Sequence, residues 1–391
     1  RAGAALVGGR RGVITLAADT PHGPERTAGL GIGPAELGEL QTVPRGSASH
    51  TRLLDDVAGG GTASRNGRRA HIAHPDIAAD PGLDERHRQV AARLGCAASY
   101  AAPFGTDAGS RVGAAVWFYD EPAEPSPRQR HLLTLYARCA AEHLDRHLEL
   151  ARAREAVAAV REELLPSRLP RVPGVRLAVR HHAGARGGGH FHDVLPLPDR
   201  ALGLAVGAVT GGGPGAIAAM GRLRASLRAY AVMEGEDPVA VLSDLELLLR
   251  LTEPSRSATA LFGYAEPHAR TIVLAGAGHC PPLLTGRRRT EYAETTLSAP
   301  LGMLACWEAP SIELTLQPGE TLLLYTDGLL HRTGEPADRA FVRLQSAAAT
   351  APAEAREDPE LLVDHVLDSL LPGGIDDPDA SEDVVLLAAR F

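Results

Sequence analysis

The sequence predicts an α+β protein made of two domains that are joined by a helix. The chain has 391 residues, which is more than a single hydrophobic core usually serves. In both halves, short alternating apolar runs typical of strands lie among longer runs of helical periodicity. A continuous helical pattern separates the halves, so we expect domains at 1–149 and 167–391 with a helical linker at 150–166.

Composition argues against several classes of protein. A net charge of −8 gives no basic footprint for nucleic acid. The four cysteines are far apart and lack C-x-x-C spacing, which argues against a disulfide framework and a zinc knuckle. No apolar run reaches the roughly 20 residues that span a bilayer, and no signal peptide is apparent. We expect a cytoplasmic protein that binds neither nucleic acid nor membrane.

The N-terminal segment has strand-like runs at 13–16 and 112–119 and a helical run at 84–94. It resembles a GAF domain over residues 57–71 and in five motifs: GLGI at 29–32, AHPDIAADP at 73–81, LGC at 94–96, APF at 102–104 and VGAAV at 112–116. The resemblance implies a sensor domain at 1–149 for an unknown small molecule. We expect an apolar pocket lined by residues 94–100 and 112–119, since ligand sites are usually concave and apolar.

The helix between the domains begins at Ser126 and Pro127, a favoured pair for the N-cap and first helical position. Its last part carries apolar residues at alternating spacings of three and four: Leu150, Ala153, Val157, Val160 and Leu164. This seam predicts a homodimer through paired helices. The alternative is a helix that packs on its own domain, because two heptads are fewer than a confident coiled coil needs.

The C-terminal segment has strand-like runs at 175–180, 201–209, 259–266, 271–276, 312–316, 321–326 and 383–390. Amphipathic helices are expected at 215–232, 238–251 and 358–371. Many strands interrupted by a pair of helices predict a β-sandwich flanked by helices.

Ordered motifs in this segment resemble the bacterial PPM-type (type 2C-like) serine/threonine phosphatases of the SpoIIE family. They are ELLPSRLP at 163–170, GGHFHDVLP at 188–196, GAVTGGG at 207–213, MGRLR at 220–224, AGHCPPLL at 277–284, PLGM at 300–303, LYTDGL at 324–329 and EDVVLL at 382–387. The resemblance implies action on phosphoserine in anti-sigma-factor antagonists. It also implies a site where two Mg²⁺ or Mn²⁺ ions, held by aspartates, activate the attacking water.

The resemblance also shows that the metal site is depleted. His190 replaces the aspartate of the family's G-G-D motif, and Ala208 replaces the aspartate that bridges both ions. Gly212 replaces the histidine of the following turn. Asp327 is retained, and Glu382 keeps a carboxylate at the last ligand position, while Asp193 and Asp383 lie outside the family's ligand positions. Two of four expected carboxylates are therefore missing.

Each remaining candidate has two interpretations. Asp327 is an inherited metal ligand or an Asx-turn residue, and Glu382 is a ligand or an exposed acid before a strand. The turn at Gly211 and Gly213 either cradles a phosphate ahead of a helix or only preserves a tight turn.

Histidines cluster around the same motif. His190 and His192 would share a face on a strand and, with His181 and His182, could form a transition-metal site. The more common alternative is a set of exposed histidines in a glycine-rich loop.

The functional expectation is a signalling pseudophosphatase that binds a phosphoprotein or a STAS-like anti-sigma-factor antagonist, with no metal cofactor. The rival is an active metal-dependent phosphoserine phosphatase or other hydrolase that uses an altered, histidine-containing site with Mn²⁺ or Mg²⁺. A third hypothesis makes the N-terminal sensor the principal function. Ala208 separates the first two, because no rearrangement of side chains restores a missing bridging carboxylate.

Overall fold

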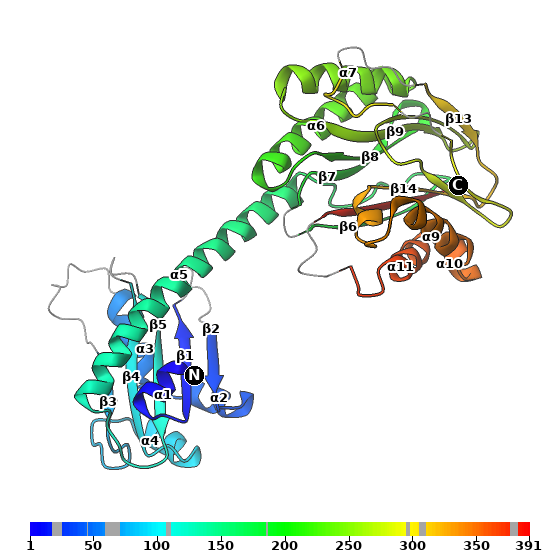
Figure 1. The fold of residues 1–391 in the computed structure, drawn as a ribbon. Coiled ribbons are helices and arrows are strands. Elements are labelled where there is room, and N and C mark those ends of the chain that lie inside the picture. The colour runs from blue at the N-terminus through cyan, green and yellow to red at the C-terminus, as the bar shows by residue number, and fades with distance from the viewer. Residues whose placement is uncertain are drawn as a thin grey trace. The chain divides into compact units, whose positions relative to one another are not determined.

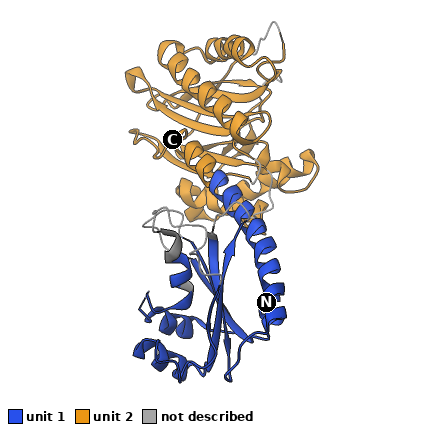
Figure 2. Ribbon diagram, turned by 90° about the vertical axis from the view of Figure 1, so that its left-hand side faces the viewer, with its two compact units in different colours: residues 1–154 blue, residues 155–391 orange. Residues whose placement is uncertain are grey.

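The computed structural model describes residues 1–17, 26–44, 46–58, 71–106, 111–184, 187–294, 298–304, 310–375 and 382–391. The chain divides into two compact units, Arg1–Arg154 and Glu155–Phe391, which Figure 2 shows in different colours. Residues 59–70, in the GAF-like part of the sequence, lie outside the described residues.

Unit 1 is built on an antiparallel sheet with the strand order β2-β1-β5-β4-β3. Its strands are β1 (Arg11–Leu16), β2 (Arg26–Leu30), β3 (Ile72–His74), β4 (Ala98–Gly105) and β5 (Arg111–Tyr119). Its helices are α1 (Ala2–Val7), α2 (Pro34–Gln41), α3 (Ser49–Ala58), α4 (Glu85–Arg93) and the start of α5 (Pro127–Glu163). Residues of α1 and α5 pack on one face of the sheet, and residues of α3 and α4 pack on the other.

A cavity of about 790 Å³ lies in unit 1, on the face of the sheet that α5 covers. Ala115 and Trp117 of β5 line it, together with residues of β1, β2 and α5 such as Ile14 and Tyr136. The expected lining by residues 94–100 is wrong for this cavity. Residues such as Cys96 pack into the core on the opposite face. A small cavity of about 20 Å³ on that face is lined by Ser99, Val116 and Phe118 among others, which belong to the two predicted segments.

Helix α5 has 37 residues and begins where the sequence predicted. The Ser126 amide donates to the Gln129 side chain (2.8 Å), and the Gln129 amide faces Ser126 Oγ (3.4 Å), a reciprocal cap. Along the predicted seam, Leu150 is 47% exposed and Val160 is 57% exposed. Within the described chain, this part of the helix therefore presents apolar side chains to solvent.

Unit 2 contains two five-stranded sheets, with strand orders β13-β10-β9-β8-β7 and β12-β11-β14-β15-β6. The first sheet consists of β7 (His190–Pro196), β8 (Leu202–Val209), β9 (Ala258–Glu266), β10 (Thr271–Ala277) and β13 (Ile312–Thr315). The second consists of β6 (Arg176–His182), β11 (Leu283–Thr285), β12 (Thr290–Tyr292), β14 (Thr321–Tyr325) and β15 (Val384–Arg390).

Helices cover both outer faces of unit 2 (Figure 1). The long helices α6 (Gly213–Glu234) and α7 (Pro238–Thr252) pack on the first sheet, around buried residues such as Met220, Leu245 and Phe262. The short helix α8 (Gly328–His331), α9 (Ala337–Ala349), α10 (Ala353–Glu357) and α11 (Pro359–Leu370) pack on the second. A third apolar cluster, including Leu204, Leu274 and Leu387, joins the inner faces of the sheets. The predicted sandwich flanked by helices is confirmed.

The sequence predicted the long helices of unit 2 within a few residues, because their ends carry strong local signals. Asp237 caps α7 by accepting from the amides of Val239 (3.0 Å) and Ala240 (3.2 Å), and Asp358 caps α11 through Glu360 (3.0 Å). Strand β7 and helix α9 were not among the predicted elements. In the described chain, glycines directly precede β7, and a glycine-rich sequence predicts a loop and not a strand.

Candidate functional site

The two positions where the resemblance implies missing carboxylates face each other across neighbouring strands. His190 is the first residue of β7, and its register partner on β8 is Ala208. Side chains directly opposite each other in an antiparallel pair lie roughly 4.5–5.5 Å apart at Cβ. An imidazole and a methyl group therefore occupy the place where the resemblance implied two aspartates.

Asp327 lies beside this pair, at the end of β14. It is the N-cap of α8, and its carboxylate accepts from the amide of Gly328 (3.0 Å). The His190 ring packs on Gly328, since a Cβ atom at that glycine would lie 3.1 Å from His190 Cε1. The structure thus brings Asp327 and His190 together, and the Asp327 carboxylate bonds the amide that directly follows it. A ligand role for Asp327 stays a prediction.

The orientation of His190 is set by the residue before Asp327. His190 Nδ1 lies 2.9 Å from Thr326 Oγ1, and the same hydroxyl oxygen accepts from the amide of Val385 (3.1 Å). Because that oxygen already accepts one bond, its proton is available to His190 Nδ1. The imidazole is therefore held by protein groups on one side.

A second histidine, His279 of the AGHCPPLL motif, also belongs to this region, although it was not among the predicted site residues. His279 Nε2 lies 3.0 Å from the Tyr325 carbonyl oxygen, and Nδ1 lies 3.3 Å from Thr259 Oγ1. Burial lowers the pKa of His279 to about 4, although Asp327 acts in the opposite direction. His279 is therefore neutral at pH 7 and links the strand ends of both sheets.

Glu382 is turned to a different partner. Its carboxylate lies 2.9 Å from His331 Nδ1, and the two side chains are 45% and 59% exposed. This contact at the surface matches the interpretation of an exposed acid before a strand. A ligand role for Glu382 would require it to leave His331.

Asp383 is buried, being 1% exposed, and organises the glycine-rich segment before β7. Its carboxylate accepts from the amides of Gly184 (2.9 Å), Gly188 (2.6 Å) and His190 (3.3 Å). Gly188 has a φ of +120°, a backbone conformation that residues other than glycine rarely adopt. Asp383 therefore holds the backbone that places His190.

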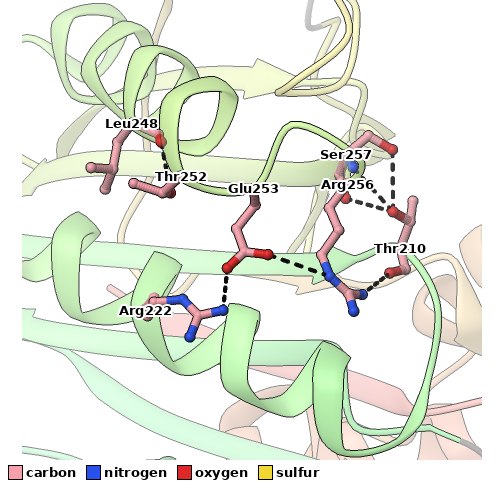
Figure 3. Close-up of polar contacts among 7 residues, drawn as sticks. All are labelled: Thr210, Arg222, Leu248, Thr252, Glu253, Arg256 and Ser257. Carbon is pink, nitrogen blue, oxygen red and sulfur yellow. Dashed lines mark hydrogen bonds and ion pairs between the residues drawn. The ribbon is translucent and has the colours of Figure 1, made fainter.

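The turn between β8 and α6 requires its glycines. Gly211 and Gly213 have φ of +93° and +72°. Neighbouring residues hold the turn, as Figure 3 shows: Ser257 N donates to Thr210 Oγ1 (3.1 Å), and Arg256 Nη1 donates to the Thr210 carbonyl (3.2 Å).

The Arg256 guanidinium lies against the same turn. A Cβ atom on Gly215 would meet Arg256 Nη2 at 2.6 Å, and Glu253 lies 3.6 Å from Arg256 Nε. The positive charge of Arg256 thus lies beside the backbone amides at the N-terminus of α6, a helix of 22 residues. This arrangement is compatible with both interpretations of the glycines, a phosphate-binding turn and a tight turn without a ligand.

The donor set does not fit a pair of Mg²⁺ or Mn²⁺ ions. Such ions require several oxygen ligands, and a pair requires one carboxylate that touches both. Here the facing pair His190 and Ala208 supplies no carboxylate, and Glu382 is paired with His331. Over the described ranges, no group of three or more His, Cys, Asp and Glu side chains is placed to hold a metal ion. No helix among these residues is long and apolar enough to cross a bilayer.

The expectation of exposed histidines in a loop is wrong for His192. It lies in the middle of β7 and is 3% exposed. The strand places it on the face that His190 and Val194 share, toward the opposite sheet, and its ring lies 5.5 Å from that of His181, between centroids.

Comparisons with known proteins identify the family and the fold of the C-terminal part of the chain. The family model of stage II sporulation protein E (SpoIIE) matches residues 198–391. The solved RsbU and RsbW domains of Rv1364c from Mycobacterium tuberculosis share 31% identity with this chain at a TM-score of 0.51. That match covers 58% of this chain and 63% of the other, so this chain spans less than two thirds of that chain's length.

The SiaA-PP2C domain of Pseudomonas aeruginosa shares the fold at 18% identity and a TM-score of 0.51, over 63% of this chain and 98% of that domain. The family match contains the ordered motifs from GAVTGGG at 207–213 to EDVVLL at 382–387, whereas β6, β7 and His190 precede it. Residues 198–391 therefore form a PPM-type phosphatase domain of the SpoIIE family.

Proposed function

We propose that this domain is a pseudophosphatase, which recognises a phosphoserine-containing protein without hydrolysing it. The observation that carries the proposal is the pairing of His190 with Ala208 across β7 and β8. A two-ion mechanism needs a carboxylate between the ions to hold them and to activate water. An alanine at that position supplies neither charge nor a ligand.

The proposed partner is a phosphoprotein or a STAS-like anti-sigma-factor antagonist, as the family resemblance implies. Similarity to a structure that contains RsbU and RsbW domains supports a partner in sigma-factor regulation. The turn at Gly211 and Gly213, with Arg256 beside it, offers backbone amides and a cation to a phosphate.

The test combines turnover and binding on the full chain. With Mn²⁺ or Mg²⁺ present, we expect negligible release of phosphate from a phosphoserine peptide but measurable binding by fluorescence anisotropy. Arg256→Gln should weaken that binding about tenfold, since a hydrogen bond to a charged group contributes about 1.5–3 kcal/mol. Arg287→Gln is the matched control, because Arg287 is 82% exposed and its ion pair is with Glu357. Metal-dependent turnover at rates typical of enzymes would overturn the proposal.

The alternative proposal is an active hydrolase that uses another metal. The observation in its favour is the proximity of Asp327 to His190, which together offer one carboxylate and one imidazole. Turnover that appears with a transition metal and disappears in Asp327→Asn would establish it.

For unit 1, we propose a GAF-like sensor domain that binds an unknown small molecule. The cavity of about 790 Å³ supports this, because its lining by Trp117, Phe104 and Leu144 is largely apolar. The cytoplasmic location expected from the sequence stays a prediction.

We propose that the chain forms a homodimer through α5. The seam residues Leu150 and Val160 are exposed in the single chain, and a second copy of the helix would cover them. Light scattering should give a dimer for the parent chain and a monomer for Val157→Asp. Ala159→Asp, on another face of the helix, should stay dimeric. A monomeric parent chain would contradict the proposal.

A further inference from the structure

Two histidines outside the depleted site lie at the open edge of the sandwich. His181 is near the end of β6, the edge strand of one sheet, and His192 is in β7, the edge strand of the other. His181 follows Leu177 and Val179 on the face of β6 that packs between the sheets, and His192 precedes Val194 on the corresponding face of β7. The two imidazoles therefore meet from opposite sheets.

All four ring nitrogens of this pair are buried and lack a hydrogen-bond partner among the described residues. Buried polar atoms are almost always paired, because an unpaired one loses its bonds to water without replacing them. Four such atoms in two adjacent rings point to a ligand that both rings share.

A cavity of about 530 Å³ adjoins the two rings. Glu162 and Glu163, in the last turn of α5, line it together with Arg161 and Ser167. The wall that these residues form is fixed to the sandwich. The Leu164 carbonyl accepts from Arg224 Nη1 (2.6 Å), and Arg224 Nε lies 2.9 Å from the buried Asp193.

The rings are arranged as two ligands of one ion would be. Their centroids are 5.5 Å apart and their planes meet at 77°. Imidazole nitrogens bind zinc at about 2.0–2.1 Å, which places two ring centroids roughly 5–6 Å apart. Burial lowers the pKa of each histidine to about 3, with a further effect of Arg161 on His181 and of the neighbouring His181 on His192. Both imidazoles are therefore neutral at pH 7, the form that binds a metal.

We propose that His181 and His192 bind one transition-metal ion of borderline softness, such as Zn²⁺, at the edge of the sandwich. Water from the cavity completes the coordination. This site differs from the PPM metal site in position and chemistry, since imidazoles favour Zn²⁺ and disfavour Mg²⁺. The ion would join β6 of one sheet to β7 of the other.

The test uses the full chain without an affinity tag, stripped with a chelator and titrated with Zn²⁺ against a competing chelator. We expect one ion per chain, no displacement by millimolar Mg²⁺, and a melting temperature about 5–10 °C higher at zinc about 100-fold above Kd. His181→Gln and His192→Gln should each weaken binding at least about 100-fold, because each removes one of two protein ligands. His268→Gln is the control, since His268 is exposed in the turn between β9 and β10.

X-ray absorption at the zinc edge gives a readout that does not depend on the variants folding. The loaded parent chain should show two imidazole ligands per ion. The proposal is overturned if the stripped chain takes up no zinc, if His181→Gln binds as tightly as the parent, or if the spectrum lacks imidazole. The proposed pseudophosphatase function depends on other residues. If that proposal proved wrong, the expected results for zinc binding would be unchanged.

Discussion

The double variant His190→Asp with Ala208→Asp is expected to bind Mn²⁺ where the parent chain does not. The two positions are register partners on β7 and β8, so the new carboxylates would lie roughly 4.5–5.5 Å apart at Cβ. That spacing suits a pair of ions about 3.5–4 Å apart. Asp327, beside His190, would contribute a third carboxylate.

Without metal, the same variant should be less stable than the parent. Ala208 is 8% exposed, so an aspartate there places a charge in a largely buried position opposite a second carboxylate. Mn²⁺ should restore the melting temperature by binding only the folded state. Both effects have the same cause, so they should appear together.

Calorimetry with Mn²⁺ on the parent, both single variants and the double variant measures the effect directly. Each single variant should bind weakly or not at all, because one carboxylate cannot replace the pair. His268→Asp adds a carboxylate at an exposed position and controls for charge alone. Tight binding of two ions by the parent would instead favour the active hydrolase. A folded double variant that binds no Mn²⁺ would contradict the proposal that positions 190 and 208 correspond to the family's metal-binding aspartates.

Arg224→Met is expected to lower the free energy of unfolding by about 3–5 kcal/mol, the usual cost of breaking a buried ion pair. Asp193 is 1% exposed and Arg224 is 8% exposed, so the variant leaves a buried charge without its main partner. Arg228 lies 3.4 Å from the same carboxylate and is half exposed, which favours the lower end of this range. The change also removes the hydrogen bond to Leu164.

Urea denaturation measures this effect, with Arg287→Met as the control. Arg287 and Glu357 form an exposed pair, which should contribute no more than about 1 kcal/mol. Adding Asp193→Asn to Arg224→Met should recover part of the loss, because the unpaired charge is then gone. A loss below about 1 kcal/mol for Arg224→Met alone would show that the pair is not needed for stability.

Features that depend on neighbouring residues could be predicted from the sequence alone. Helix ends were predictable because Asp84, Asp237 and Asp358 each cap amides two or three positions ahead. The replacements at His190 and Ala208 were visible because the motifs that contain them are continuous segments of chain.

Only the tertiary structure decided how the acids and histidines are used, because their partners are far away in the sequence. Asp383 accepts from amides almost 200 residues earlier, Glu382 is paired with His331, and no local pattern encodes either contact. His181 and His192 are close in the sequence, but they lie on different sheets. Their burial arises when the edges of two sheets meet, and strand periodicity alone could not distinguish it from exposure in a loop.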